Sequence, residues 1–144
     1  MIAAAPAMPN AAPFIGIPYV ARGRSLVGAD CWGVVLLASR ALFGRELPEF
    51  FYCDDALGLL PEAEKLIAFE TVRARWQPVQ PRAGSAPFDA GVVHVFRIWG
   101  HPTHVGLHLG GADFLHSLPG RNACIESLRD GNWVQRRVGS FVYG

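Results

Sequence analysis

The chain changes character near its middle, and this change constrains its fold more than any other feature. Residues up to about 76 carry apolar positions at helical spacing, whereas the remainder holds short apolar runs punctuated by glycine and proline. The runs expected to form strands are residues 92–96, 103–109, 113–117, 124–128 and 141–143. Helices followed by closely spaced strands predict an α+β fold, with N-terminal helices packed on a mostly antiparallel sheet of about five or six strands.

Two helices are expected in the first half of the chain. Asp30 suits an N-cap, and apolar residues recur at helical spacing over residues 31–42 until Gly44, which suits a C-cap. This helix should be central and buried. A proline suits the first turn of a second helix over residues 61–76, whose mixed charges predict a peripheral position. Residues 77–87 contain three prolines, which indicates a linker-like loop.

Length and composition favour one compact domain. The chain has 144 residues, of which 51% are hydrophobic and 17% are charged, so it is long enough for a single substantial core. Residues 1–13 form an Ala/Pro-rich N-terminal arm, and residues 14–144 are expected to form the domain. Its first part, residues 14–28, is predicted to be a loop with a short turn near Gly16.

Several classes of partner and location are disfavoured by the sequence. The net charge of +1, without clusters of lysine and arginine, argues against a nucleic-acid partner. No apolar run approaches the roughly 20 residues of a membrane span. The N-terminus lacks the basic region of a secretory signal, so we expect a protein made in the cytoplasm and either retained there or delivered outside by another route.

The cysteines do not form a recognisable disulfide or zinc framework. The chain has three cysteines, Cys31, Cys53 and Cys124, so they cannot all pair within the chain. No C-x-x-C pair is present. A zinc site built of thiolates is therefore not expected. Cys53 and Cys124 are interpreted as small buried hydrophobic residues.

Cys31 stands at the predicted start of the central helix, and this position favours a reactive, nucleophilic cysteine. Unpaired N–H groups at a helix N-terminus stabilise a thiolate, which is the nucleophilic form of cysteine. His104 and His116 lie on two successive expected strands, where an imidazole can take the thiol proton and a second group can orient that imidazole. This combination is typical of a cysteine peptidase. The alternative is an inert, buried cysteine.

The motifs resemble those of the NlpC-type papain-like cysteine peptidases, which cleave cell-wall peptides. The resemblance runs from Tyr19 to Tyr143 and rests on three pieces of sequence. They are Tyr19, the Asp-Cys-x-Gly helix start at residues 30–33, and His-Val-Gly-Leu-x-Leu-Gly at residues 104–110 followed by Phe-Leu-His at residues 114–116. Tyr19 lies 12 positions before Cys31, and His104 lies 12 positions before His116, as this family leads us to expect. The family fold is the papain-like arrangement of helices packed on a sheet.

The resemblance implies a role for each matching residue. Cys31 matches the nucleophile, His104 the general base and acid, and His116 the polar residue that orients His104. Tyr19 matches a tyrosine whose hydroxyl faces the developing oxyanion, which the Cys31 backbone N–H would also bind; a core tyrosine is the alternative. Asp30 matches a residue that recognises a substrate amino group, a role compatible with helix capping.

The sequence departs from the common family pattern beside the nucleophile. Trp32 replaces a small residue, usually serine, so it should reshape or pack against a substrate subsite. His101 and His108 accompany His104, but no thiol or acidic residue completes a spaced ligand set, so no metal and no other cofactor is expected. His108 is expected to pack in the core or cleft, and His94 to have no chemical role.

The Asp-Cys-Trp-Gly variant resembles peptidases encoded in bacteriophage tail modules. This implies hydrolysis of an amide bond in peptidoglycan stem peptides, between D-glutamate and diaminopimelate. The expected partners are peptidoglycan peptides and other phage tail proteins of the hub or tip. The protein would be made in the host cytoplasm and act from the virion tail at the host cell wall. The alternatives are a non-catalytic structural tail module, and an amidase or acyltransferase on the same fold.

Overall fold

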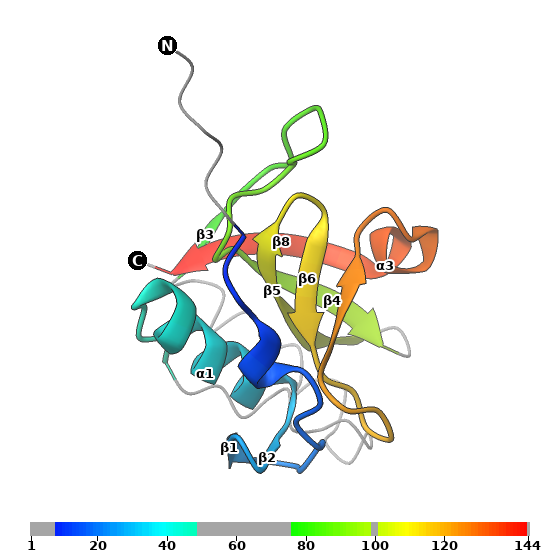
Figure 1. Cartoon of the computed structure of the whole chain (residues 1–144). Helices are drawn as coiled ribbons and strands as arrows, with labels where there is room; N and C mark the ends of the chain where they lie inside the picture. The colour runs from blue at the N-terminus through cyan, green and yellow to red at the C-terminus, as the bar shows by residue number, and fades with distance from the viewer. Residues whose placement is uncertain (1–7, 49–75, 99–100, 144) are drawn as a thin grey trace.

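The computed structural model describes residues 8–48, 76–98 and 101–143, without the side chains of 101–103. A helix lies over one face of a six-stranded sheet, whose strand order is β3-β8-β4-β5-β6-β7 and whose neighbours are all antiparallel (Figure 1). This confirms the expected α+β class. The strands are β3 (Trp76–Pro78), β4 (Val93–Ile98), β5 (His101–Gly110), β6 (Asp113–His116), β7 (Cys124–Ser127) and β8 (Arg137–Tyr143).

The predicted central helix is confirmed as α1 (Cys31–Phe43), including both of its ends. Asp30 caps it, because Oδ1 accepts a hydrogen bond from the Gly33 N–H at 2.7 Å. Gly44 ends it in the left-handed conformation, with φ of 61°, and donates its N–H to the Arg40 carbonyl. Helix α1 packs against β5 and β6, the strands on which His104 and His116 stand.

A small hairpin that the sequence did not predict precedes α1. Its strands are β1 (Arg24–Ser25) and β2 (Gly28–Ala29), within the segment expected to be loop. It packs directly on the helix start, since a Cβ at Gly33 would lie 2.2 Å from the Gly23 carbonyl oxygen. Only glycine fits at that close approach. The hairpin therefore helps to fix the first turn of α1.

The sheet buries a separate apolar cluster on each face. The α1 face contains the helix and inward-pointing valines and leucines of β4, β5 and β6, such as Val105 and Leu107. The opposite face holds a mainly aromatic cluster that includes Phe96, Phe114 and Trp133. Alternation along each strand produces this division, because successive side chains point to opposite faces.

Two predictions about the connections are corrected by the structure. Trp76–Pro78 forms edge strand β3, where a helix end and a loop were expected; proline is tolerated there because an edge strand needs fewer donors. A short helix, α3 (Gly131–Arg136), was not predicted, although Asp130 caps it as a local signal. The rest of the second predicted helix, residues 61–75, lies outside the described residues.

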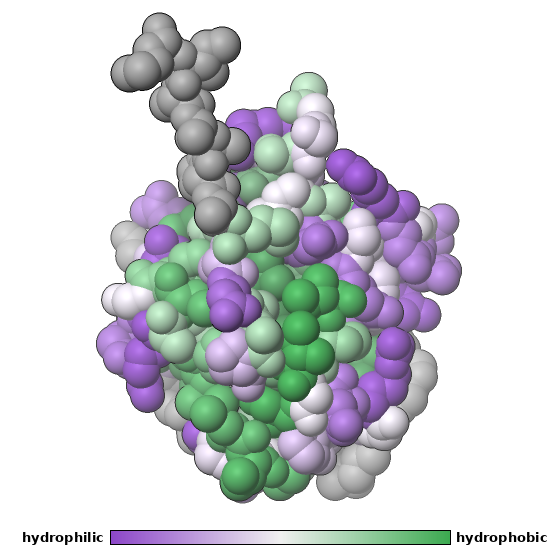
Figure 2. Space-filling view, viewed as in Figure 1, coloured by the Kyte–Doolittle hydropathy of each residue, from purple (hydrophilic) through white to green (hydrophobic). Residues whose placement is uncertain are grey.

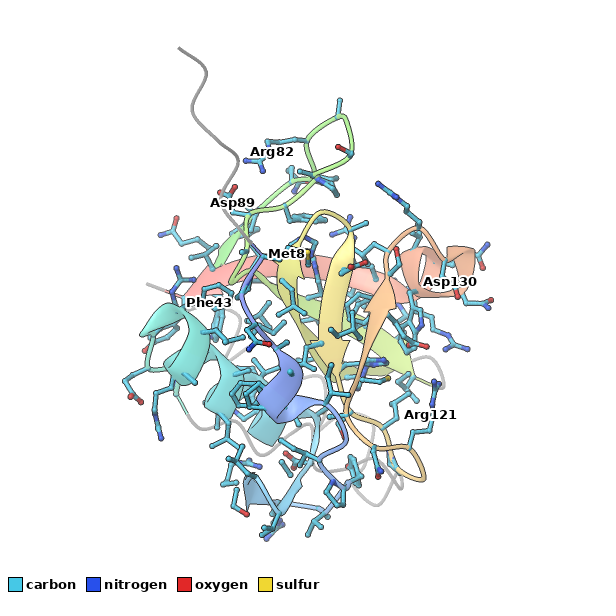
Figure 3. All side chains as sticks on the ribbon, viewed as in Figure 1. Met8, Phe43, Arg82, Asp89, Arg121 and Asp130 are labelled. Atoms are coloured by element: carbon cyan, nitrogen blue, oxygen red, sulfur yellow. The ribbon has the colours of Figure 1, made fainter. Side chains whose placement is uncertain are left out.

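The described part of the N-terminal arm packs on the domain. Ala11 is buried in the α1 cluster, and the short 3-10 helix η1 (Ala12–Phe14) follows it. The sulfur-bearing side chain of Met8 lies beside Gly110 at the end of β5 (Figure 3). Gly16 and Ile17 then exchange backbone hydrogen bonds with Ala123, next to β7. The chain thus joins the fold before Phe14.

Apolar surface gathers at the β1–β2 end of the molecule. Leu26 is 56% exposed and Val27 is 84% exposed, and this end of the space-filling view is predominantly apolar (Figure 2). Among the described residues, the helices are all too short or too polar to span a bilayer.

Candidate active site

Helix α1 begins with Cys31, and the start of this helix lies toward the end of the sheet where β6 finishes (Figure 1). The side chain is only 2% exposed, so it is largely shielded from bulk water. The N–H groups of a helix's first turn point outward from that end and favour negative charge there. Cys31 therefore occupies a position that stabilises a thiolate.

His104 and His116 form a hydrogen-bonded pair on adjacent strands. The Nε2 atom of His104 lies 2.8 Å from Nδ1 of His116, and both side chains are buried. Antiparallel pairing of β5 with β6 brings the two residues to neighbouring positions on one face. The expectation that these strands present the two imidazoles side by side is confirmed. Their catalytic roles remain predictions.

Aromatic side chains shield the histidine pair from water. Trp133 of α3 lies 5.8 Å from His104 and 4.7 Å from His116 between ring centroids, and Phe96 lies 5.8 Å from His104. Gly106 leaves room for this packing, because a Cβ there would lie 2.8 Å from the Phe114 ring. The short helix that the sequence did not reveal thus contributes the indole over both imidazoles.

Burial keeps both imidazoles neutral. It holds the pKa of His104 well below 6.5, helped by nearby His116 and Arg136. Burial also lowers the pKa of His116 to about 4, against the opposing effect of the Glu126 carboxylate. A neutral imidazole has one N–H donor and one acceptor nitrogen, so the pair has a definite direction of hydrogen bonding.

Two residues of β7 also reach His116, and sequence analysis missed them. Glu126 Oε2 lies 2.6 Å from His116 Nε2, and Cys124 Sγ lies 3.6 Å from the same nitrogen. The expectation that no thiol or acidic residue completes a possible ligand set with these histidines is therefore wrong. Cys124 is half-buried beside the site, where burial raises the pKa of its thiol. The register of β6 with β7 brings these residues together, and sequence spacing alone does not show it.

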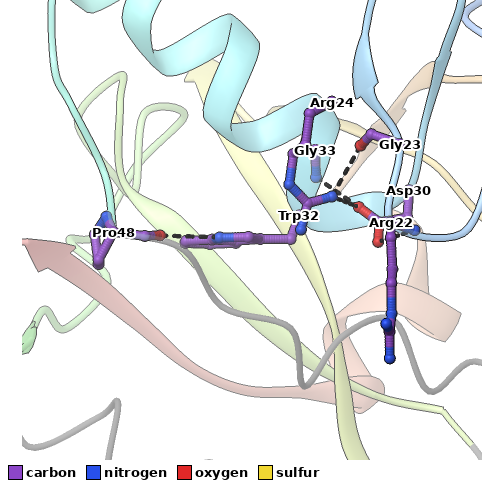
Figure 4. Close-up of polar contacts among 7 residues, drawn as sticks. All are labelled: Arg22, Gly23, Arg24, Asp30, Trp32, Gly33 and Pro48. Atoms are coloured by element: carbon purple, nitrogen blue, oxygen red, sulfur yellow. Dashed lines mark hydrogen bonds and ion pairs between the residues drawn. The ribbon is translucent and has the colours of Figure 1, made fainter.

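Asp30 is fully occupied by protein contacts at the helix start (Figure 4). Its side chain is entirely buried; Oδ1 also accepts from Arg24 Nη1 at 2.7 Å, and Oδ2 accepts from the Arg22 N–H at 3.1 Å. These contacts tie the β1–β2 hairpin to α1. The predicted capping role is confirmed, and the substrate role remains a prediction.

Trp32 points into the core beside the nucleophile. It is 1% exposed and donates its indole N–H to the Pro48 carbonyl at 3.0 Å (Figure 4). It also packs edge-to-face on Trp76, with 6.0 Å between ring centroids. Tyr19 lies upstream, half-buried, with a buried hydroxyl oxygen. Pro18 next to it accepts a hydrogen bond from Ala29, which links this segment to the strand before α1.

The remaining histidines form a separate buried pair. His94 Nδ1 lies 2.7 Å from Ser140 Oγ, and His94 Nε2 lies 3.0 Å from His108 Nδ1. His108 Nε2 donates a hydrogen bond to the Gly111 carbonyl, 3.0 Å away, because a carbonyl oxygen can only accept. His108 packs in the core, as expected. The side chain of His101 lies outside the described residues.

Comparisons with known proteins agree with this fold. Residues 16–142 match the model of the NlpC/P60 family. The chain is 26% identical over 129 residues to the Escherichia coli K12 protein named murein DD-endopeptidase MepS/murein LD-carboxypeptidase, with 90% of this chain and 57% of that protein covered. The chain thus spans little more than half the length of this curated relative.

Solved structures of related domains share the fold. An NlpC/P60 family protein from Bacillus cereus ATCC 10987 is 21% identical, with a TM-score of 0.59 and coverage of 90% of this chain and 36% of that one. The NlpC/p60 domain of peptidoglycan hydrolase SagA is 21% identical, with a TM-score of 0.53 and coverage of 90% and 89%.

Proposed function

Because this chain belongs to the NlpC/P60 family, we propose that it is a cysteine peptidase that hydrolyses amide bonds in peptidoglycan stem peptides. The observation that carries the proposal is the hydrogen-bonded pair of His104 and His116, on the two strands against which the Cys31 helix packs. A buried cysteine at a helix start is common, but an imidazole pair with defined polarity on the adjoining strands suits nucleophile activation.

The roles follow from the chemistry of each group. His104 takes the thiol proton, and the Cys31 thiolate attacks the substrate carbonyl to form a carbon–sulfur bond. The Cys31 backbone N–H and the Tyr19 hydroxyl stabilise the oxyanion. His104 then returns its proton to the leaving amine as the carbon–nitrogen bond breaks. A water deprotonated by His104 hydrolyses the thioester and restores the thiol.

The proposed substrate site is shaped by residues around the first turn of α1. Asp30 and Trp32 are both buried, so they act on substrate selection by fixing this turn. We propose the D-glutamyl–diaminopimelate bond as the target. The name of the Escherichia coli relative describes DD-endopeptidase and LD-carboxypeptidase activities, so cleavage of those bonds is the outcome to compare.

We also propose that the protein works in a bacteriophage tail, bound to hub or tip proteins. Support comes from the Asp-Cys-Trp-Gly motif at residues 30–33, which is similar to that of tail-module peptidases. In this setting the protein is made in the host cytoplasm and acts from the virion at the cell wall. The alternative functions are a non-catalytic structural tail module, and an amidase or acyltransferase on the same fold.

Mass spectrometry of purified muropeptides tests the proposed reaction. Wild-type protein should yield fragments cut within the stem peptide, and Cys31→Ala should yield none. Release of intact stem peptides from the glycan would indicate an amidase, and products joined to an added amine would indicate an acyltransferase. Absence of every product, together with slow alkylation of Cys31 near neutral pH, would favour the structural module.

A further inference from the structure

The carboxylate of Glu126 contacts His116 on the side away from His104. His116 uses Nδ1 toward His104 Nε2 and presents Nε2 to Glu126 Oε2, at 2.8 Å and 2.6 Å respectively. The Glu126 oxygen is itself buried, and its approach to His116 is off the ideal hydrogen-bond direction. The other Glu126 oxygen, Oε1, lies 3.3 Å from Arg121 Nη2. The carboxylate is thus shared between one surface cation and one buried imidazole.

An ionised carboxylate accepts hydrogen bonds and cannot donate them, which gives the row of groups a direction. Glu126 therefore favours the His116 form that carries its proton on Nε2. The Nδ1 atom of that form is an acceptor, so His104 must donate through Nε2 across the 2.8 Å contact. The lone pair of His104 is then on Nδ1, the nitrogen that remains to accept a proton.

The distance between His116 and Glu126 favours a proton between these two groups over a metal ion bound to both. His116, Cys124 and Glu126 offer nitrogen, sulfur and oxygen atoms within 4.8 Å of one another, as a cation site would. Two ligands of one tetrahedral zinc ion would be separated by roughly 3.3 Å, given bonds of about 2.0 Å. The observed 2.6 Å between His116 Nε2 and Glu126 Oε2 is too short for that arrangement. It lies nearer the roughly 2.7–2.9 Å of a charge-assisted N–H···O contact.

We propose that Glu126 is a positioning residue, which sets the tautomers of His116 and His104 so that His104 Nδ1 is the free base. The inference rests on the proposed function for its catalytic consequence. Which nitrogen of each imidazole carries the proton can be measured independently of enzyme activity. The contacts of Glu126 are with His116 and Arg121, and we infer that it acts on the reaction through His116.

The test combines nitrogen-15 NMR of the imidazoles with kinetics in Glu126→Gln and Glu126→Ala. In the wild-type protein, His104 and His116 should both carry the proton on Nε2. Glu126→Ala removes the acceptor beside His116 Nε2, so protons should move toward Nδ1 on both rings. Glu126→Gln is the same size and keeps an amide oxygen that accepts the Nε2 proton without the carboxylate charge, so its shift should be smaller. Activity should fall roughly 10- to 100-fold, as for other residues that orient functional imidazoles. Glu46→Gln, an exposed carboxylate paired with Arg40, is the matched control.

A double-mutant cycle distinguishes positioning from general stabilisation. With Asn at position 116 the imidazole is gone, so adding Glu126→Ala should cost little further activity. Unchanged Nε2 protonation in both Glu126 variants would overturn the inference, as would fully additive losses in the cycle. Inactive wild-type protein that still shows the tautomer change would refute the peptidase function and leave the positioning role intact.

Discussion

His104 Nε2 lies 2.8 Å from His116 Nδ1, so the imidazole predicted to act as base is held through Nε2, and Nδ1 is the nitrogen left for proton transfer. Proton transfer from a thiol requires the other nitrogen, Nδ1, to be unprotonated. Burial keeps the pKa of both rings low, and both are therefore neutral near pH 7. The thiol proton must then pass to a neutral His104, which accepts it as the thiolate forms.

Replacement of Cys31 should abolish hydrolysis without unfolding the protein. Cys31→Ala and Cys31→Ser remove the nucleophile, and both side chains are small enough for a position that is 2% exposed. Peptidoglycan digestion, followed by chromatography of muropeptides, measures the loss, and circular dichroism checks the fold. Cys124→Ser is the matched thiol control for alkylation. Turnover by Cys31→Ala would rule out the cysteine peptidase mechanism.

The two histidines should differ in how much activity their loss removes. His104→Ala eliminates the base, so its rate should fall about as far as that of Cys31→Ala, because such residues act as a unit. His116→Asn should retain more activity, since an amide oxygen still accepts the His104 N–H. Initial rates on the same muropeptide compare the two. A correctly folded His116→Asn protein as inactive as His104→Ala would contradict the orienting role.

A strong chelator should leave the rate unchanged. The proposed steps use only the thiol, the imidazole and hydrogen-bond donors, and the atoms of His116 and Glu126 lie too close for two ligands of one zinc ion. Rates before and after EDTA treatment and dialysis test this, with added zinc as the second arm. Loss of activity on chelation and its recovery with zinc would instead support a metal at His116, Cys124 and Glu126.

The ends of α1 were predictable because their signals are local. An Asp cap and a terminal glycine act within a few residues, and Asp30 and Gly44 both hold the predicted conformations. The hairpin before α1 was not predictable, since strands of two residues carry no periodicity. Strand β3 likewise depends on pairing with the distant end of β8, which overrides its proline.

The candidate site shows the same limit. His104 and His116 stand on strands with clear alternation, and their contact followed from the expected antiparallel pairing. The contact of Glu126 with His116 could be predicted only from the exact register of β6 with β7, because a shift of one residue would turn the Glu126 side chain to the other face. The contact of Trp133 with the histidines depends on the position of α3, and this helix is too short to show a helical period in the sequence. Local patterns identified the elements, but cross-strand register determined which side chains meet.

Trp32→Ser should destabilise the protein by about 3–5 kcal/mol, as large-to-small substitutions of buried aromatic residues do. The indole is 1% exposed, contacts Trp76, and donates to the Pro48 carbonyl, so the variant loses packing and a hydrogen bond together. Urea denaturation measures the free energy of unfolding. Val27→Ser, at a side chain 84% exposed, should change it by less than about 0.5 kcal/mol. A small loss for Trp32→Ser, with altered bond choice, would instead indicate direct substrate contact.

The protein should lose stability as the pH falls from about 6.5 toward 4. Burial lowers the pKa of His94, His104, His108 and His116, in the last case to about 4. Below pH 6.5 the unfolded chain therefore binds more protons than the folded one, and each such histidine costs up to about 1.4 kcal/mol per pH unit.

For His116 this cost stops growing below about pH 4, where the folded form is also protonated. Urea midpoints at several pH values measure the trend, and His116→Asn should reduce its slope because asparagine does not titrate. An exposed-surface variant such as Val27→Ser should leave the slope unchanged, because it removes no titrating group. Stability independent of pH between 6.5 and 4.5 would mean that these imidazoles are protonated without cost, contrary to their burial.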